Sequence, residues 1–469
     1  MKKPFVHRFI PNSAPGVREE MLKVTGYNTV EEIYEEIPEA LRFKGELKLP
    51  KEPVSEMEID RRIKHTLLKN RTTQELLSFL GAGCWLHYVP ALCVEITSRS
   101  EFLTAYAGGD MTDHGRYQAM FEYQSMMGDL LAMDVVSAPV YDGTTAAGDA
   151  LHIASRATGG REILIPSTIS PNTLATIKNY ADPWLELRKI DHDPKTGLMD
   201  LEDLKGKLSS STAAVFVENP SYLGFIEEQC EEIAGLAHEA GALLIACINP
   251  VSLGLLAAPG EYGADIACGE GQPLGMAQSC GGATMGILAV NDSDRFLELM
   301  PSFLVGISNT IVPGELAFSW HTLWQRMLYS TRDRARSFTG TSSWLWGISA
   351  AVYMALMGPE GMKKLGKTNM QKAHYAIDIL SKIPGLKAPL FSATPFNEFV
   401  INFDGTGKTV ATINRALFEE GILGGKDLTE DFPGLGQAAL YCVTEVHRKE
   451  DIDRLAEVLI KIVLQNGGK

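Results

Sequence analysis

Apolar residues in the first part of the chain recur every three or four positions, the spacing of a helix with one buried face. The pattern predicts helices within 16–27, 29–38 and 55–70. Ser55 and Glu58 have the spacing of a capping box, which marks the start of the third helix. We expect these residues to form a charged helical arm without a core of its own.

From about residue 131, short apolar runs rich in β-branched residues alternate with helical patterns. The runs lie at 161–167, 184–190, 212–220, 242–250, 264–271 and 285–291, and helical patterns fill 169–181 and 230–241. This alternation predicts an α/β fold with a mostly parallel sheet covered by helices on both faces.

Three polar motifs directly follow predicted strands of that sheet. They are Val217–Ser221, Ile248–Ser252 and Gly269–Pro273. In parallel sheets ligands bind at the carboxyl ends of the strands, so we expect the three motifs to converge on one cleft.

The last part of the chain begins with an apolar helix at 342–358, which Gly358 and Pro359 are expected to end. Further strands and helices follow and indicate a small α+β domain. The predicted organisation is a helical arm (1–75), a large α/β domain (76–330) and a small C-terminal α+β domain (331–469).

Composition narrows the class of protein. Of the 469 residues, 45% are hydrophobic and 22% are charged, as in soluble proteins with a well-filled core. The net charge of −15 argues against a nucleic-acid or anionic-membrane partner, because both require a basic face. The start lacks an apolar run of signal-peptide length and no segment is apolar enough to span a bilayer, so we expect a cytoplasmic protein.

Seven cysteines are scattered without a C-x-x-C pair. They are interpreted as buried free thiols of a reducing compartment, with a zinc site or a catalytic thiol as the alternatives.

The segment 140–160 has the pattern of a strand end, a glycine turn and a helix rich in small residues. Gly143, Thr144 and Thr145 stand at the N-terminus of that helix, where free N–H groups and partial positive charge favour a phosphate. The alternative is that the small residues at 146–148 only allow close packing of the helix.

Two other segments carry candidate site residues. In 77–90, a glycine-rich turn can bring backbone close to a ligand, and His87 and Tyr88 follow as a possible donor pair. The alternative is that His87 is a structural histidine.

In 105–124, the residues Asp110, Asp113 and His114 suit acid–base work, substrate contact or binding of a cation, although their spacing matches no metal motif. A solvated loop is the alternative for this group.

Taken together, the longer motifs resemble one family. They are RFIPN (8–12), EIPEALRFKGELKLP (36–50), LSFLGAG (77–83), HYVPA (87–91), FEYQSMMGDL (121–130), VYDGTTA (140–146), NPSYLGFIEE (219–228), INPVSLGLLAAPGEYGADIACGEGQPLG (248–275) and FNEFVINF (396–403). In this order they resemble subunit 1 of the two-chain glycine decarboxylase, the P-protein of the glycine cleavage system. The resemblance covers nearly the whole chain.

The resemblance implies the fold of fold-type-I pyridoxal phosphate enzymes, with a seven-stranded, mostly parallel sheet. It also implies a division of labour in which a second subunit carries the Schiff-base lysine and the cofactor. This chain has no lysine between Lys207 and Lys363, and Gln272 and Pro273 occupy the place of the lysine loop. Asn249 stands where a carboxylate would pair with the pyridinium nitrogen. We therefore expect no cofactor and no catalytic residue in this chain alone, and a relic anion site at 143–145.

The same resemblance implies the partners. Subunit 2 and this chain would form an α2β2 heterotetramer that decarboxylates glycine and passes the aminomethyl group to the lipoyl arm of the H-protein. Tyr106, His87, Tyr88, Asp113 and His114 are the residues of this chain expected to line the partner's site.

Two stretches, 107–115 and 332–347, depart from the family pattern. They leave two alternatives open. One is a diverged paralogue whose complex acts on another amino acid or amine, with Asp110, Asp113 and His114 facing the substrate. The other is a non-enzymatic scaffold or regulatory subunit that uses the same interface.

Overall fold

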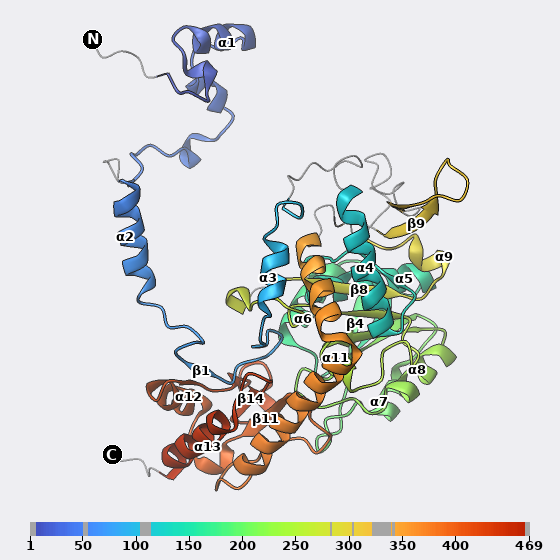
Figure 1. Cartoon of the computed structure of the whole chain (residues 1–469). Helices are drawn as coiled ribbons and strands as arrows, with labels where there is room; N and C mark the ends of the chain where they lie inside the picture. The colour runs from blue at the N-terminus through green and yellow to red at the C-terminus, as the bar shows by residue number, and fades with distance from the viewer. Residues whose placement is uncertain are drawn as a thin grey trace. The chain divides into compact units, whose positions relative to one another are not determined.

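The computed structural model describes residues 6–49, 55–103, 114–281, 284–302, 304–320, 339 and 343–464. The chain divides into two compact units, Met1–Arg71 and Thr72–Lys469 (Figure 1). The boundary that the sequence suggests at residue 330 falls outside the described residues.

The described residues of the first unit form two α-helices, α1 (Val17–Thr25) and α2 (Glu56–Leu67). The Ser55 hydroxyl accepts a hydrogen bond from the Glu58 N–H at 3.2 Å, which confirms the predicted cap. The prediction of a helix within 29–38 is wrong, because only a 3₁₀ turn, Glu31–Tyr34, forms there. Pro38 disfavours helical geometry at the residue before it and limits the segment. Leu22 is the single buried residue among those described in this unit, so the arm has no core.

The second unit is built on a seven-stranded sheet, as predicted. Its spatial order is β2-β8-β7-β6-β5-β3-β4. The strands are β2 (Val135–Val136), β3 (Glu162–Pro166), β4 (Glu186–Ile190), β5 (Thr212–Asn219), β6 (Leu243–Ile248), β7 (Ile266–Glu270) and β8 (Gly286–Val290). Neighbouring strands from β4 to β7 are parallel, and β8 is antiparallel to both β7 and β2.

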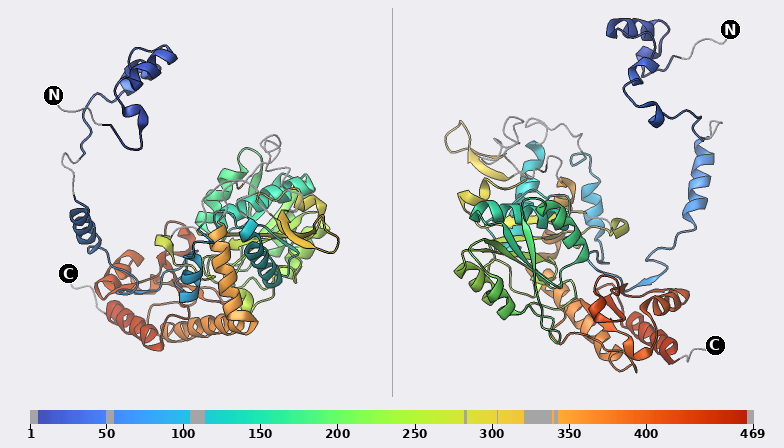
Figure 2. Two further views of the ribbon diagram at one scale, coloured as in Figure 1. Left: turned by 45° about the horizontal axis from the view of Figure 1, so that its top comes forward. Right: turned by 180° about the vertical axis from the view of Figure 1, so that it is seen from behind.

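Two layers of helices cover the sheet (Figures 1 and 2). Because side chains alternate along a strand, Val215 and Val217 of β5 face one core while Ala214 and Phe216 face the other. The first core is shared with α4 (His114–Leu131), α8 (Cys230–Glu239) and the start of α11, and the second with α5 (Gly143–Thr158) and α6 (Pro171–Ala181). Shorter elements are α3 (Ala91–Thr97), α7 (Leu201–Lys207), α9 (Asp294–Leu297), β9 (Val305–Asn309) and β10 (Leu316–Trp320).

A second, smaller sheet lies in the C-terminal part of this unit. It pairs β11 (Glu398–Asn402), β14 (Ala438–Cys442) and β13 (Lys426–Asp427) in that order. Helices α12 (Val410–Glu419) and α13 (Lys449–Leu464) pack on it. The segment β1 (Leu77–Ser78) pairs in parallel with β12 (Ile422–Leu423), which ties residues far apart in sequence together.

Helix α11 (Trp344–Leu380) connects the first core of the seven-stranded sheet with the core of the smaller sheet (Figure 1). Gly358 breaks its geometry at φ 57° and ψ 178°, as the sequence predicts. The helix does not end there, however. It resumes at once because Pro359 has the backbone angle of a first helical position and needs no N–H partner.

Of the seven cysteines, all free, Cys93, Cys230, Cys268 and Cys442 are buried as expected. Cys84 and Cys247 are half-buried, and Cys280 is exposed. Among the helices that the structure describes, none has both the length and the apolar character that crossing a bilayer requires.

Candidate functional site

A cavity of about 420 Å³ lies at the carboxyl ends of β5, β6 and β7. Glu218, Asn249 and Glu270 reach it from these three strand ends, so the predicted convergence of the three motifs is confirmed. The N-termini of α5 and α6, the backbone of 82–85 and Glu398 of β11 complete the wall. The site is thus assembled from both sheets of the second unit.

The N-terminus of α5 is capped by carboxylates of the chain itself. The Gly143 N–H donates to Glu270 Oε2 at 3.0 Å. Asp142 Oδ1 accepts from the Thr145 N–H at 2.6 Å and from the Thr144 hydroxyl at 2.9 Å. A Cβ on Gly143 would lie 2.7 Å from the Glu270 nitrogen, so this close approach requires glycine. The Gly143 and Thr145 N–H groups, which could otherwise hold a phosphate, are therefore taken up internally.

Glu270 also shapes the loop after β7. Its Oε1 accepts from the Gln272 N–H at 3.0 Å, the Thr284 hydroxyl at 2.8 Å and the Met285 N–H at 3.2 Å. Burial raises the pKa of this carboxyl despite these hydrogen bonds, which act in the opposite direction. The carboxylate is thus a structural anchor at the place where an anion would bind.

Gln272 occupies the position expected for a lysine and is almost fully buried. Its Oε1 accepts from the Trp85 N–H at 3.1 Å and its Nε2 donates to the Met276 carbonyl at 2.9 Å. The amide therefore joins the loop after β7 to the segment after β1. This role needs both a donor and an acceptor, which a lysine does not offer.

These residues do not fit pyridoxal phosphate. The described residues that line the cavity include no lysine for a Schiff base and no lysine, arginine or histidine for a phosphate. Asn249 replaces the carboxylate that would stabilise a protonated ring nitrogen. Nor do the described residues contain a group of three or more histidine, cysteine, aspartate or glutamate side chains arranged to hold a metal.

Two further buried carboxylates face the cavity. Glu398 accepts from the Ala82 N–H at 2.6 Å and from Trp85 Nε1–H at 2.7 Å. Glu218 accepts from the Ser170 N–H at 3.1 Å. Burial raises the pKa of each to about 7, because the neutral donors around them offset only part of the lost hydration.

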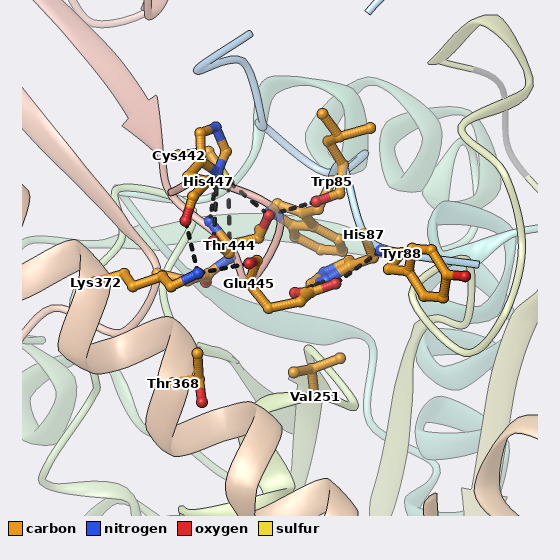
Figure 3. Close-up of polar contacts among 12 residues, drawn as sticks. Trp85, His87, Tyr88, Val251, Thr368, Lys372, Cys442, Thr444, Glu445 and His447 are labelled. Atoms are coloured by element: carbon orange, nitrogen blue, oxygen red, sulfur yellow. Dashed lines mark hydrogen bonds and ion pairs between the residues drawn. The ribbon is translucent and has the colours of Figure 1, made fainter. Parts of the chain in front are cut away.

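His87 and Tyr88 lie on a segment that contacts the C-terminal part of the second unit (Figure 3). The His87 Nδ1 and the Tyr88 N–H both contact the Glu445 carboxylate, each at 2.8 Å. Lys372 Nζ donates to the carbonyls of Glu445 and His447 at 2.6 Å. Burial would raise the pKa of Glu445, but the contacts with His87 and the Tyr88 N–H outweigh it, so the pKa is lowered.

The two residues therefore differ in what they present to the surroundings. The His87 side chain is 1% exposed and its Nε2 has no hydrogen-bond partner among the described residues. Tyr88 is 67% exposed. Glu445 holds the His87 ring inside, while the adjacent Tyr88 ring projects from the surface.

The other predicted site residues cannot be placed in the same way. Tyr106, Asp110 and Asp113 lie outside the described residues, and His114 is described only as the first residue of α4. Their roles stay predictions.

Three carboxylates of the site and its surroundings were not predicted as site residues from the sequence: Glu270, Glu398 and Glu445. Glu270 lies inside the motif at 269–273, so its place after a strand was available as a signal. Glu398 and Glu445 meet partners that are more than 300 positions away, so only the folded chain brings them together.

Comparison with known proteins agrees with this architecture. Residues 7–459 match the family described as glycine cleavage system P-protein. The chain is 39% identical over 465 residues to the probable glycine dehydrogenase (decarboxylating) subunit 1 of Staphylothermus marinus, covering 97% of this chain and 98% of the relative. It is 38% identical to the protein of the same name from Moorella thermoacetica, covering 96% and 98%.

Solved structures show the same relationship. A crystal structure of glycine decarboxylase (P-protein) of the glycine cleavage system, in inhibitor-bound form, matches with a TM-score of 0.81 and 30% identity, over 96% of this chain and 98% of that one. A sphingosine-1-phosphate lyase from Burkholderia pseudomallei, 15% identical with a TM-score of 0.65, shares the fold. The resemblance found in the sequence is confirmed, and this chain belongs to the glycine cleavage system P-protein family.

Proposed function

We propose that this chain is the subunit of a two-chain glycine decarboxylase that does not bind pyridoxal phosphate. A lysine-bearing subunit 2 would hold the cofactor, and the complex would decarboxylate glycine and pass the aminomethyl group to the lipoyl arm of the H-protein. The near full-length match to relatives named glycine dehydrogenase (decarboxylating) subunit 1 supports this assignment.

One observation carries the division of labour. Glu270 and Asp142 occupy the helix N-terminus at which a phosphate would bind, and Gln272 replaces the lysine. A second anion at this helix end would have to displace two carboxylates and meet their like charge. The chemistry supplied by the cofactor therefore belongs to the other subunit.

This chain's contribution would be a rigid surface beside the partner's site. Tyr88 projects from a segment held by His87 and Glu445, so its backbone is anchored while its ring stays exposed. Leu92 and Val94 of the adjacent α3 are exposed apolar residues, as expected of a surface that another chain covers. We place Tyr88, with Tyr106, Asp113 and His114, toward the partner, and His87 as the residue that positions Tyr88.

The arm offers a second surface for assembly. Met57, Ile59, Ile63 and Leu67 of α2 are all exposed within a unit that has no core. Ile59, Ile63 and Leu67, spaced four residues apart, form a row on one side of the helix, and apolar side chains gain about 25 cal/mol per Å² when another surface covers them. The arm would thus fasten this chain to other subunits of an α2β2 heterotetramer.

The test combines the purified chain with subunit 2, H-protein, pyridoxal phosphate and glycine, and measures release of labelled carbon dioxide from the glycine carboxyl group. We expect turnover only when both subunits are present. Borohydride reduction should then fix the cofactor to subunit 2 and leave this chain unlabelled. A cofactor fixed to this chain would contradict the proposal.

The same assay separates the alternatives. Turnover of another amino acid or amine, without turnover of glycine, would identify a diverged paralogue. Turnover by subunit 2 that is indifferent to this chain would identify a scaffold.

A further inference from the structure

The cavity at the carboxyl ends of β5, β6 and β7 has an acidic wall. Four carboxylates, those of Asp142, Glu218, Glu270 and Glu398, line it, and the described lining residues include no lysine, arginine or histidine. The N-termini of α5 and α6 each offer roughly half a positive charge. When the four carboxyls are ionised, these helix ends offset only part of their charge.

The hydrogen bonds of Glu218 and Glu398 come from neutral groups. Glu398 accepts from one backbone N–H and one indole N–H. Glu218 accepts from the Ser170 and Tyr222 N–H groups and from the Thr173 hydroxyl. A carboxylate has about four lone-pair positions, so both retain capacity for a donor in the cavity. A cationic donor would supply the charge that the chain does not provide.

Asn249 gives an independent indication of a ligand. The residue is 6% exposed and lines the cavity. Its Oδ1 accepts from the Val251 N–H at 3.0 Å, whereas its Nδ2 makes no hydrogen bond to the residues that the structure describes. Because Asn249 lines the cavity, this N–H donor is available to an acceptor on a bound molecule.

The size of the cavity and the arrangement of its acids decide between kinds of cation. The volume of about 420 Å³ lies in the range of small-molecule sites. The described acidic side chains form no cluster that could hold a metal ion. An organic cation reaches groups that are spread over the wall, and a single metal ion does not.

We propose that this cavity binds a small organic amine, with its ammonium group at Glu398 and Glu218 and a hydrogen-bond acceptor at Asn249 Nδ2. A zwitterionic amino acid fits less well, because its carboxylate would meet an acidic wall without a cationic side chain. The inference does not depend on the proposed decarboxylase function, since it concerns this chain without its partner.

Binding should strengthen as the pH rises through about 7, the pKa of both Glu218 and Glu398. The titratable groups that face them are each other, the wall carboxyls of Asp142 and Glu270, and Tyr222, Cys247 and Cys442. Burial raises the pKa of Tyr222 and of the Cys442 thiol, and the thiol contact with Cys268 together with burial raises that of Cys247, so these three groups stay neutral across this range. If one carboxyl must ionise, the affinity at pH 8 should be about tenfold higher than at pH 6.

The test is calorimetric titration of the full chain, without partner or cofactor, using methylamine, ethanolamine and putrescine. We expect one site with a Kd below ~1 mM for at least one of them, tighter at pH 8 than at pH 6. Glycolate, an anion of similar size, should not bind.

Variants locate the site. Asn172→Lys places a tethered ammonium on an exposed residue of the cavity wall and should reduce affinity at least tenfold. Asn179→Lys makes the same change on an exposed position of α6 outside the wall and should leave affinity unchanged. Failure of all three amines to bind, equal binding by Asn172→Lys, or preferential binding of glycolate would each overturn the proposal.

Discussion

Replacing Glu398 by glutamine should change how the stability of the chain depends on pH. Glu398 is 6% exposed, and burial raises its pKa from 4.5 to about 7. Because the folded pKa lies above the unfolded one, the protonated carboxyl contributes stability that is fully present below about pH 4.5. That contribution is lost as the pH rises through about 7. A shift of this size corresponds to ~3 kcal/mol, most of it between about pH 5 and pH 8.

The variant Glu398→Gln removes this dependence but alters two hydrogen bonds. The amide oxygen replaces one acceptor, while the amide NH₂ faces either the Ala82 N–H or the Trp85 Nε1–H. One donor is then unsatisfied, at a cost of about 1–3 kcal/mol. We therefore expect the variant to be less stable than the wild type by ~1–3 kcal/mol near pH 5. Near pH 8 it should be equal to the wild type or slightly more stable.

Urea unfolding of the full chain at several pH values from 5 to 8 measures both quantities. Glu218 titrates differently in the two proteins, because the Glu398 charge raises its pKa. The difference in free energy of unfolding therefore reports Glu398 together with its coupling to Glu218. Glu239→Gln, on the exposed end of α8, is the matched control and should differ from the wild type by less than ~0.5 kcal/mol throughout. A difference for Glu398→Gln that stays constant with pH would refute the reasoning.

Three further substitutions test other parts of the structure. Glu445→Gln leaves His87 Nδ1 or the Tyr88 N–H without its acceptor and should lower the free energy of unfolding by ~1–3 kcal/mol at neutral pH. Because the pKa of Glu445 is lowered in the fold, urea unfolding should show this difference shrinking as the pH falls through the folded pKa. Gly254→Ala places a Cβ 2.2 Å from the Met362 carbonyl oxygen and should cost ~1–3 kcal/mol in the same assay, and an unchanged midpoint would contradict this packing. Tyr88→Ala removes an exposed ring and should leave stability within ~0.5 kcal/mol while weakening turnover with subunit 2; unaffected turnover would show that Tyr88 does not serve the partner.

Local patterns in the sequence predicted the features that depend on neighbouring residues. The strands around 212–219 and 243–248 were recognisable because buried parallel strands are short, apolar and rich in β-branched residues. The cap at Ser55 and the break at Gly358 also follow from the chemistry of a few adjacent residues. Predictions were wrong where several local signals compete. The segment 29–38 forms a 3₁₀ turn and not the expected helix, and α11 continues from Pro359 although it was expected to end there.

For the candidate site, the sequence by itself determined which strand ends meet and that no lysine stands among them. Both follow from topology and residue identity alone. Only the tertiary structure decided that Glu270 caps α5, that Glu398 reaches Ala82 and Trp85 from the other sheet, and that His87 is held inside. These contacts join residues more than a hundred positions apart. A local pattern in the sequence does not predict which distant side chain accepts a hydrogen bond from a buried donor. That choice is made when the sheets and helices pack and each buried polar group must find a partner.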